Sequence, residues 1–355
     1  MAVHRKLGIG AALALVFLPA GSDARLAAGD GPADPGYRHG SVARSEIGSG
    51  PRSYLLFEPA EPSPGRAPVV VFQHGWLAMN PGVYGAWIEH LARRGNIVVY
   101  PRFMEPETPV EQYLPNALGA IVDAFDVLES SPTHIRPDRR RFAIVGHSTG
   151  GVLAAQVAAL AASRGLPEPR AVIAVTPGDL FRTKGPDLAR IPATTLLVVV
   201  ATEHDVVTGD NRARRIYREA SSVPASRKKF VLYRTDLRGR PWFWADHLAP
   251  TASLAAFDNG DGPFRAFQMS QGATNAMDRQ GFWRVADITI AAGYDGRSLD
   301  DATARGESFR RLGYWSDGRR VLAPIVADDL SDVPRVLPSH GFRLVPWSTR
   351  EAPGP

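Results

Sequence analysis

Short, continuous runs of apolar residues recur along this chain and alternate with segments whose apolar residues have helical spacing. Apolar runs without polar positions are typical of parallel strands that are buried on both faces. The runs that predict strands are 53–57, 69–72, 97–100, 142–145, 171–175, 195–201 and 229–233, and those that predict helices are 83–94, 110–128, 152–162 and 277–292. Because strand and helix alternate, the sequence predicts an α/β fold with a mostly parallel central sheet flanked by helices.

The strand expected at 142–145 leads directly into Gly146-His147-Ser148-Thr149-Gly150, and an alanine-rich helix is expected to follow. The pattern Gly-x-Ser-x-Gly between a strand and a helix is typical of a nucleophile elbow, a strained turn that exposes a serine. Glycines flank the serine because bulky neighbours would clash in so sharp a turn. The pattern predicts Ser148 as a nucleophile; the alternative interpretation is an ordinary glycine-rich turn of an α/β protein.

With this motif in this setting, residues 50–260 resemble the α/β-hydrolase superfamily. Within it, the chain is most similar to the cluster of dienelactone hydrolases, chlorophyllases and cutinase-like polyester hydrolases. The resemblance implies the α/β-hydrolase fold and a catalytic triad in the chain order serine, acid, histidine.

That order places the acid and the histidine after later strands. Asp205 follows the strand expected at 195–201 and is the candidate acid, with Glu203 and Asp210 as alternatives. His247 stands in the loop after the strand at 229–233 and is the candidate general base. A buried acid would orient the histidine, which would take the serine proton and return it to the leaving group. The alternatives are a loop-capping carboxylate and a structural histidine.

The oxyanion of the tetrahedral intermediate needs two backbone donors. The N–H of Thr149 lies at the positive N-terminal end of the expected helix and is the first. The turn His74-Gly75-Trp76 ends an earlier strand, and in this family such a turn supplies the second donor, here the N–H of Trp76.

The stretch between Pro177 and Thr195 is too short for the helical cap domain of many lipases, so we expect an open site without a large cap. An open cleft with aromatic walls suits an ester that has a bulky acyl or aromatic part. The candidate substrate-binding residues are Tyr100, Phe103, Leu180, Phe181, Trp242 and Trp244.

These features together predict a carboxylesterase-like serine hydrolase that forms an acyl-enzyme with a small-molecule or polymeric ester. The same triad also fits a peptidase or an acyltransferase, and a non-catalytic binding protein can share the scaffold. No cofactor or metal is expected, because the sequence shows no Rossmann or P-loop pattern, no cysteine and no zinc or calcium spacing. The net charge of +5 is spread along the chain without a nucleic-acid-binding motif, so no nucleic acid partner is expected.

The N-terminus has a basic region at 4–6, an apolar run at 7–18 and an Ala-x-Ala-like site that ends at Ala24. This pattern predicts a signal peptide at 1–24, and hence a secreted or periplasmic protein without a stable membrane anchor after cleavage. A linker is expected at 25–36 and the catalytic domain at 37–262. A C-terminal helical and irregular extension, 263–355, is expected to pack on the same domain.

Overall fold

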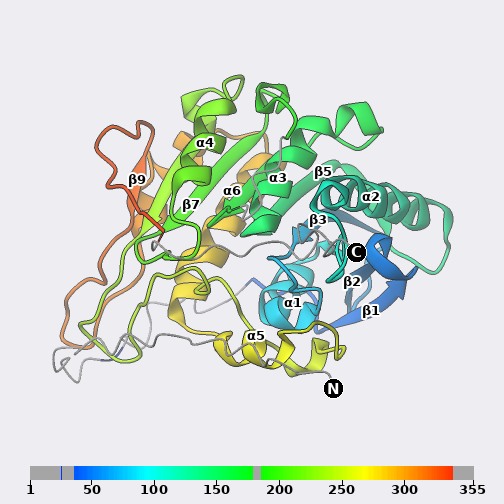
Figure 1. The fold of residues 1–355 in the computed structure, drawn as a ribbon, viewed down its shortest axis with the longest axis horizontal. Coiled ribbons are helices and arrows are strands. Elements are labelled where there is room, and N and C mark those ends of the chain that lie inside the picture. The colour runs from blue at the N-terminus through cyan, green and yellow to red at the C-terminus, as the bar shows by residue number, and fades with distance from the viewer. Residues whose placement is uncertain (1–24, 26–35, 179–184, 339–355) are drawn as a thin grey trace, which may run out of the picture.

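The computed structural model of the chain describes residue 25, residues 36–178 and residues 185–338 (Figure 1). The expected signal peptide at 1–24 lies outside the described residues, as does most of the expected linker. In the described residues no helix is both long and apolar enough to cross a membrane.

Within these residues, nine strands form one sheet in the order β1-β2-β4-β3-β5-β6-β7-β8-β9. The six central strands, β4-β3-β5-β6-β7-β8 in sheet order, pair in parallel, whereas β1, β2 and β9 are antiparallel at the two edges. Their bounds are β1 Ser41–Ile47, β2 Tyr54–Ala60, β3 Arg66–Gln73, β4 Ile97–Pro101, β5 Arg136–His147, β6 Ala171–Val175, β7 Leu196–Thr202, β8 Lys228–Tyr233 and β9 Ile325–Ala327. The predicted mostly parallel sheet is therefore confirmed.

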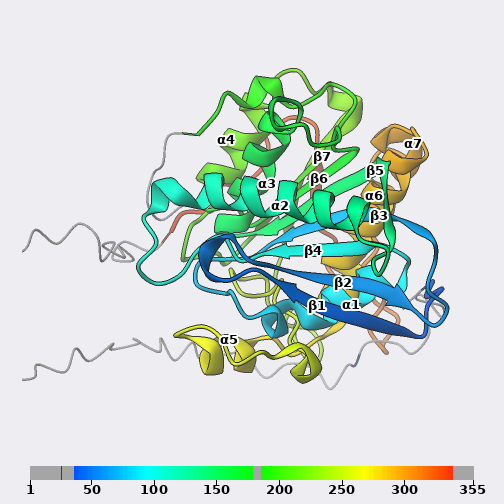
Figure 2. The same ribbon diagram turned by 90° about the vertical axis from the view of Figure 1, so that its right-hand side faces the viewer.

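Helices cover both faces of this sheet (Figures 1 and 2). Helices α2 (Tyr113–Ser130), α3 (Thr149–Leu160) and α4 (Asn211–Glu219) lie on one face, and α1 (Gly85–Arg93) and α6 (Arg284–Tyr294) lie on the other. Side chains alternate across a strand, so Val69 and Val71 pack under the first group while Val70 packs under the second. The strands read as continuous apolar runs because both of these faces are buried.

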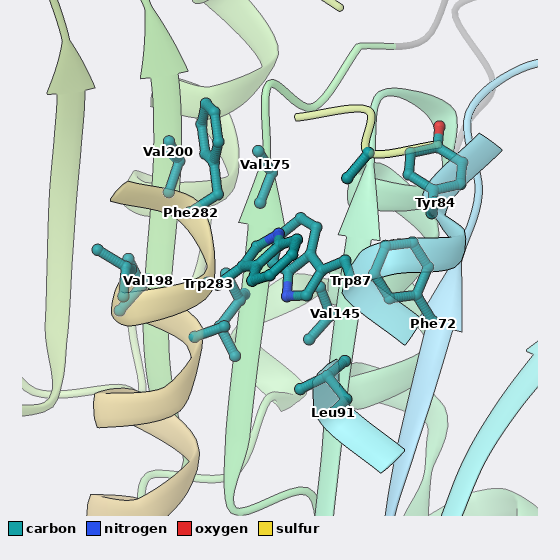
Figure 3. Close-up of a cluster of buried hydrophobic side chains, with 14 of the residues drawn as sticks. Phe72, Tyr84, Trp87, Leu91, Val145, Val175, Val198, Val200, Phe282 and Trp283 are labelled. Carbon is teal, nitrogen blue, oxygen red and sulfur yellow. The ribbon is translucent and has the colours of Figure 1, made fainter. Parts of the chain in front are cut away.

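The part of the chain after residue 262 contributes to the central core. A π-helical turn, Asp278–Trp283, precedes α6, and its Phe282 and Trp283 pack with Trp87 of α1 against the sheet (Figure 3). Residues before and after position 262 therefore share one hydrophobic core. The extension at 263–355 was expected to be helical and irregular, but its β9 pairs with β8 and extends the sheet by one strand. The remaining helices are α5 (Arg265–Gln271) and α7 (Leu299–Thr303).

Candidate active site

Ser148 sits at the tip of a sharp turn between β5 and α3. Its backbone has φ 55° and ψ −121°, a strained conformation for a residue with a side chain. The turn tolerates only glycine at its flanks. A Cβ atom added to Gly150 would lie 2.1 Å from the carbonyl oxygen of Gln73, and one added to Gly146 would lie 2.1 Å from that of Gly150. The predicted elbow is therefore present, with Ser148 immediately before the first residue of α3.

The structure brings Ser148, His247 and Asp205 together from three separate segments. His247 Nδ1 lies 2.8 Å from Asp205 Oδ2, and His247 Nε2 lies 2.9 Å from Ser148 Oγ. A carboxylate can only accept, so Nδ1–H donates to Asp205 and Nε2 is left to accept the serine hydroxyl. All three side chains are buried. This arrangement orients the imidazole for removal of the serine proton.

The loop after β7 holds Asp205 as a carboxylate. Its Oδ1 accepts from the backbone N–H groups of Val207 and Thr208 at 3.0 and 2.8 Å, and Oδ2 also accepts from the Thr208 hydroxyl at 2.9 Å. Burial by itself would raise the pKa of Asp205, but the hydrogen bonds from His247 and Thr208 outweigh it and lower this pKa below its ordinary value. Asp205 therefore carries the negative charge that the imidazolium needs.

The two alternative acids lie elsewhere. Glu203 is exposed, and its carboxylate accepts from the backbone N–H of Thr235 at 2.8 Å. Asp210 is buried, and its carboxylate pairs with Arg214 at 2.6 Å. Of the three candidates, the structure thus places Asp205 against His247.

The proposed oxyanion turn lies against the nucleophile. A Cβ atom added to Gly75 would lie 3.4 Å from Cβ of Ser148, so Trp76 begins directly beside the elbow. Thr149 is the first residue of α3, where a backbone N–H has no acceptor within the helix. The two residues proposed to supply the oxyanion donors thus belong to separate segments, and each segment lies next to Ser148.

Two predicted wall residues, Tyr100 and Phe103, do not line the site. Both side chains are fully buried, so substrate cannot reach them. The Tyr100 hydroxyl donates to the carbonyl of Ala78 at 2.6 Å, and the Phe103 ring stacks on His74 at 4.1 Å. Both predictions were wrong because these aromatic side chains turn inward at the end of β4.

The other predicted wall residues differ in their surroundings. Trp244 is 38% exposed and stacks on His204 at 4.7 Å. Trp242 is half-buried below the guanidinium of Arg240, which lies 5.3 Å from its ring centre. Leu180 and Phe181 lie outside the described residues.

Helix α5 reaches the oxyanion turn from the C-terminal part of the chain, a contact that the sequence did not reveal. The Phe264 ring lies 6.0 Å from the Trp76 ring, and the Gln268 amide donates to the Trp76 carbonyl at 3.4 Å. Phe264 and Phe267 are 40% and 57% exposed. No motif links this segment to Trp76, since almost two hundred residues separate them.

Residues 37–185 match the family model of Chlorophyllase. The matched part runs from before β1 to beyond β6, so it includes Gly75 and Ser148 and ends before Asp205 and His247. No curated protein sequence matches the chain. Together with the strand order, the match identifies the α/β-hydrolase fold, and it points to an ester hydrolase of that type. Among the described residues, no group of three or more acidic or histidine side chains could hold a metal ion.

Proposed function

We propose that this protein is a serine carboxylesterase in which Ser148 is the nucleophile, His247 the general base and Asp205 the acid of the triad. The observation that carries the proposal is the continuous hydrogen-bonded path from Ser148 Oγ through His247 to Asp205, with lengths of 2.9 and 2.8 Å. That path starts at a strained elbow whose backbone geometry exposes a nucleophile.

The geometry gives each group one task. Ser148 Oγ attacks the ester carbonyl as its proton passes to Nε2 of His247, and Asp205 stabilises the imidazolium that forms. The backbone N–H groups of Trp76 and Thr149 stabilise the negative oxygen of the tetrahedral intermediate. Nε2–H then protonates the leaving alcohol, which leaves an acyl group on Ser148. Water then attacks the acyl carbonyl as its proton passes to Nε2 of His247, and His247 returns that proton to Ser148 Oγ as the bond to the acid breaks.

The surroundings of the triad favour an ester with an apolar part. Val206, next to Asp205, is 50% exposed, and Trp244, three residues before His247, is 38% exposed. Phe264, which is 40% exposed, lies beside Trp76. Exposed apolar side chains on the loops that carry the triad offer contact area to an acyl or alcohol group.

Labelling and substitution of the nucleophile test this proposal. A fluorophosphonate should attach to Ser148, and Ser148→Ala should abolish hydrolysis of p-nitrophenyl esters while the fold is retained. Ser163→Ala, which alters an exposed serine just beyond the end of α3 opposite the active site, is the matched control and should keep full activity. An active Ser148→Ala protein would falsify the proposal.

The same triad also serves peptidases and acyltransferases, and product analysis separates them. The esterase proposal expects free acid as the main product in water, with amide substrates much slower. Release of amine from a peptide at a comparable rate, or transfer of most acyl groups to an added alcohol, would replace the esterase assignment. Either outcome would retain Ser148 as the nucleophile.

We also propose that the protein is exported, on the basis of the basic and apolar pattern at 1–24. The test is the N-terminal sequence of the protein recovered from the culture medium or periplasm. Recovery of an uncleaved chain from the cytoplasm alone would contradict it.

A further inference from the structure

His147, the residue before the nucleophile, is turned into the protein. Its side chain is 2% exposed, and both ring nitrogens have partners. Nε2 lies 2.8 Å from the backbone carbonyl oxygen of His247, and Nδ1 lies 2.8 Å from the hydroxyl of Tyr84. The Tyr84 hydroxyl also lies 3.0 Å from the backbone nitrogen of Gly75. These contacts form one buried chain of three hydrogen bonds.

The direction of each hydrogen bond in this chain is determined by its partners. The His247 carbonyl can only accept, so Nε2 of His147 carries the proton. In the neutral ring Nδ1 then accepts, and the Tyr84 hydroxyl must donate to it. The Tyr84 oxygen is thereby left to accept the N–H of Gly75. Figure 3 shows this hydroxyl directed away from Phe72, Trp87 and the other labelled apolar side chains.

Burial keeps His147 in this neutral form. Burial, and to a smaller extent the neighbouring His247, lower the pKa of His147 to about 3. The two imidazole rings are 5.1 Å apart, so a charged His147 would oppose the imidazolium that His247 becomes during acyl transfer. A neutral donor to the His247 carbonyl avoids this repulsion.

This chain of hydrogen bonds joins the three segments that must act on one substrate carbonyl. Gly75 precedes the proposed oxyanion donor Trp76, His147 precedes the nucleophile, and His247 is the general base. Asp205 holds the ring of His247 from one side, and His147 holds its backbone from the other. A displacement of about 1 Å in such an arrangement can cost on the order of 100-fold in rate.

We propose that Tyr84 and His147 are positioning residues that hold the oxyanion turn and the general base in register with Ser148. This inference rests on the proposed function of the triad. The polar atoms of both side chains are engaged in hydrogen bonds within the protein, so their effect is on the alignment of the reacting groups. Their removal therefore lowers kcat and leaves KM nearly unchanged.

The experiment compares four variants with the parent enzyme on a p-nitrophenyl ester, with thermal unfolding measured for each. Tyr84→Phe removes the hydroxyl that links Gly75 to His147, and kcat should fall about 10- to 100-fold. Tyr217→Phe is the matched control. It removes a buried tyrosine hydroxyl that donates to the backbone carbonyl of Asp328, directly after β9, and should keep kcat within about twofold. His147→Leu should resemble Tyr84→Phe, and His147→Gln should recover part of the loss because its amide can donate to the His247 carbonyl.

Three results would overturn the inference: parental kcat in Tyr84→Phe, an equal loss in Tyr217→Phe, or no difference between His147→Leu and His147→Gln. If Tyr84→Phe does not fold, the two His147 variants decide. The parent must be labelled at Ser148, and Ser148→Ala must be inactive. If the parent is not labelled or Ser148→Ala is active, the triad itself is refuted. If both requirements are met but the Tyr84 and His147 variants are fully active, only the positioning role is refuted.

Discussion

Replacement of Asp205 by asparagine should place the imidazole proton of His247 on the wrong nitrogen. Oδ1 of Asp205 accepts from two backbone N–H groups, those of Val207 and Thr208, which can only donate. The oxygen of an asparagine must therefore stay with these two donors, and its NH2 group must face Nδ1 of His247. Nδ1 then has to accept, so the proton moves to Nε2. A protonated Nε2 cannot take the proton of Ser148.

The expected loss follows from this change of tautomer. In Ser-His-Asp triads, the wrong tautomer lowers kcat by about 10⁴-fold while the geometry is retained. That factor corresponds to roughly 5 kcal/mol of transition-state stabilisation. Steady-state kinetics on a p-nitrophenyl ester measures kcat, and thermal unfolding should show that Asp205→Asn keeps the fold.

Glu203→Gln is the matched control for this experiment. Glu203 lies two residues away on the same loop, is exposed and accepts only from the backbone N–H of Thr235 among the contacts described. We expect its kcat to stay within about twofold of the parent, as for most surface substitutions. The reasoning is refuted if Asp205→Asn keeps more than about a tenth of the parental kcat, or if Glu203→Gln loses as much as Asp205→Asn.

Three further predictions concern stability and specificity. Burial raises the pKa of Asp278 to about 7, so between about pH 4 and pH 7 the folded state keeps a proton that the unfolded state has lost, and the free energy of unfolding falls as pH rises. Asp278→Asn should therefore raise Tm at pH 8 and barely change it at pH 4 in calorimetry; parallel Tm curves for the two proteins would contradict this. Arg214 is buried, pairs with the carboxylate at i−4 and donates to three backbone carbonyls of the C-terminal tail, so Arg214→Met should cost about 3–5 kcal/mol in urea unfolding. Arg215→Met, at the exposed neighbouring position, should lower the free energy of unfolding by less than about 1 kcal/mol, and similar losses for both variants would refute the argument. Phe264→Ser should lower kcat/KM about tenfold for long-chain but not acetyl esters, whereas Leu322→Ser, which alters a side chain of similar exposure away from Trp76, should change neither; equal effects of the two variants would count against an apolar subsite at α5.

Much of the fold and the identity of the elbow could be predicted from local patterns. Runs such as 171–175 are apolar at every position because helices cover both faces of the sheet, and the observed β6 has the same bounds. Gly146 and Gly150 mark the elbow because backbone oxygens occupy the space that a Cβ atom would need. Signals of this kind are contained within about ten consecutive residues.

The residues of the candidate site were harder to predict from the sequence where their role depends on the direction of a side chain. Tyr100 ends a predicted strand and Phe103 follows it at the correct end of the sheet, yet both side chains are buried in the core. Asp205 was the leading acid and Glu203, two residues away on the same loop, was an alternative; the hydrogen bond to His247 distinguishes them. A position in the chain order does not determine which way a side chain points.

The sequence by itself determined the alternation of strands and helices, the elbow around Ser148 and the order in which the other two candidates follow. These features arise from contacts between near neighbours and from uniform burial, which leave a periodic or short pattern in the chain. Only the tertiary structure decided that α5 lies beside Trp76, that β9 completes the sheet and that Tyr84 joins Gly75 to His147. Each of these contacts links segments that are distant in sequence. The packing of the whole core brings these segments together, and no short or repeated sequence pattern predicts such a contact.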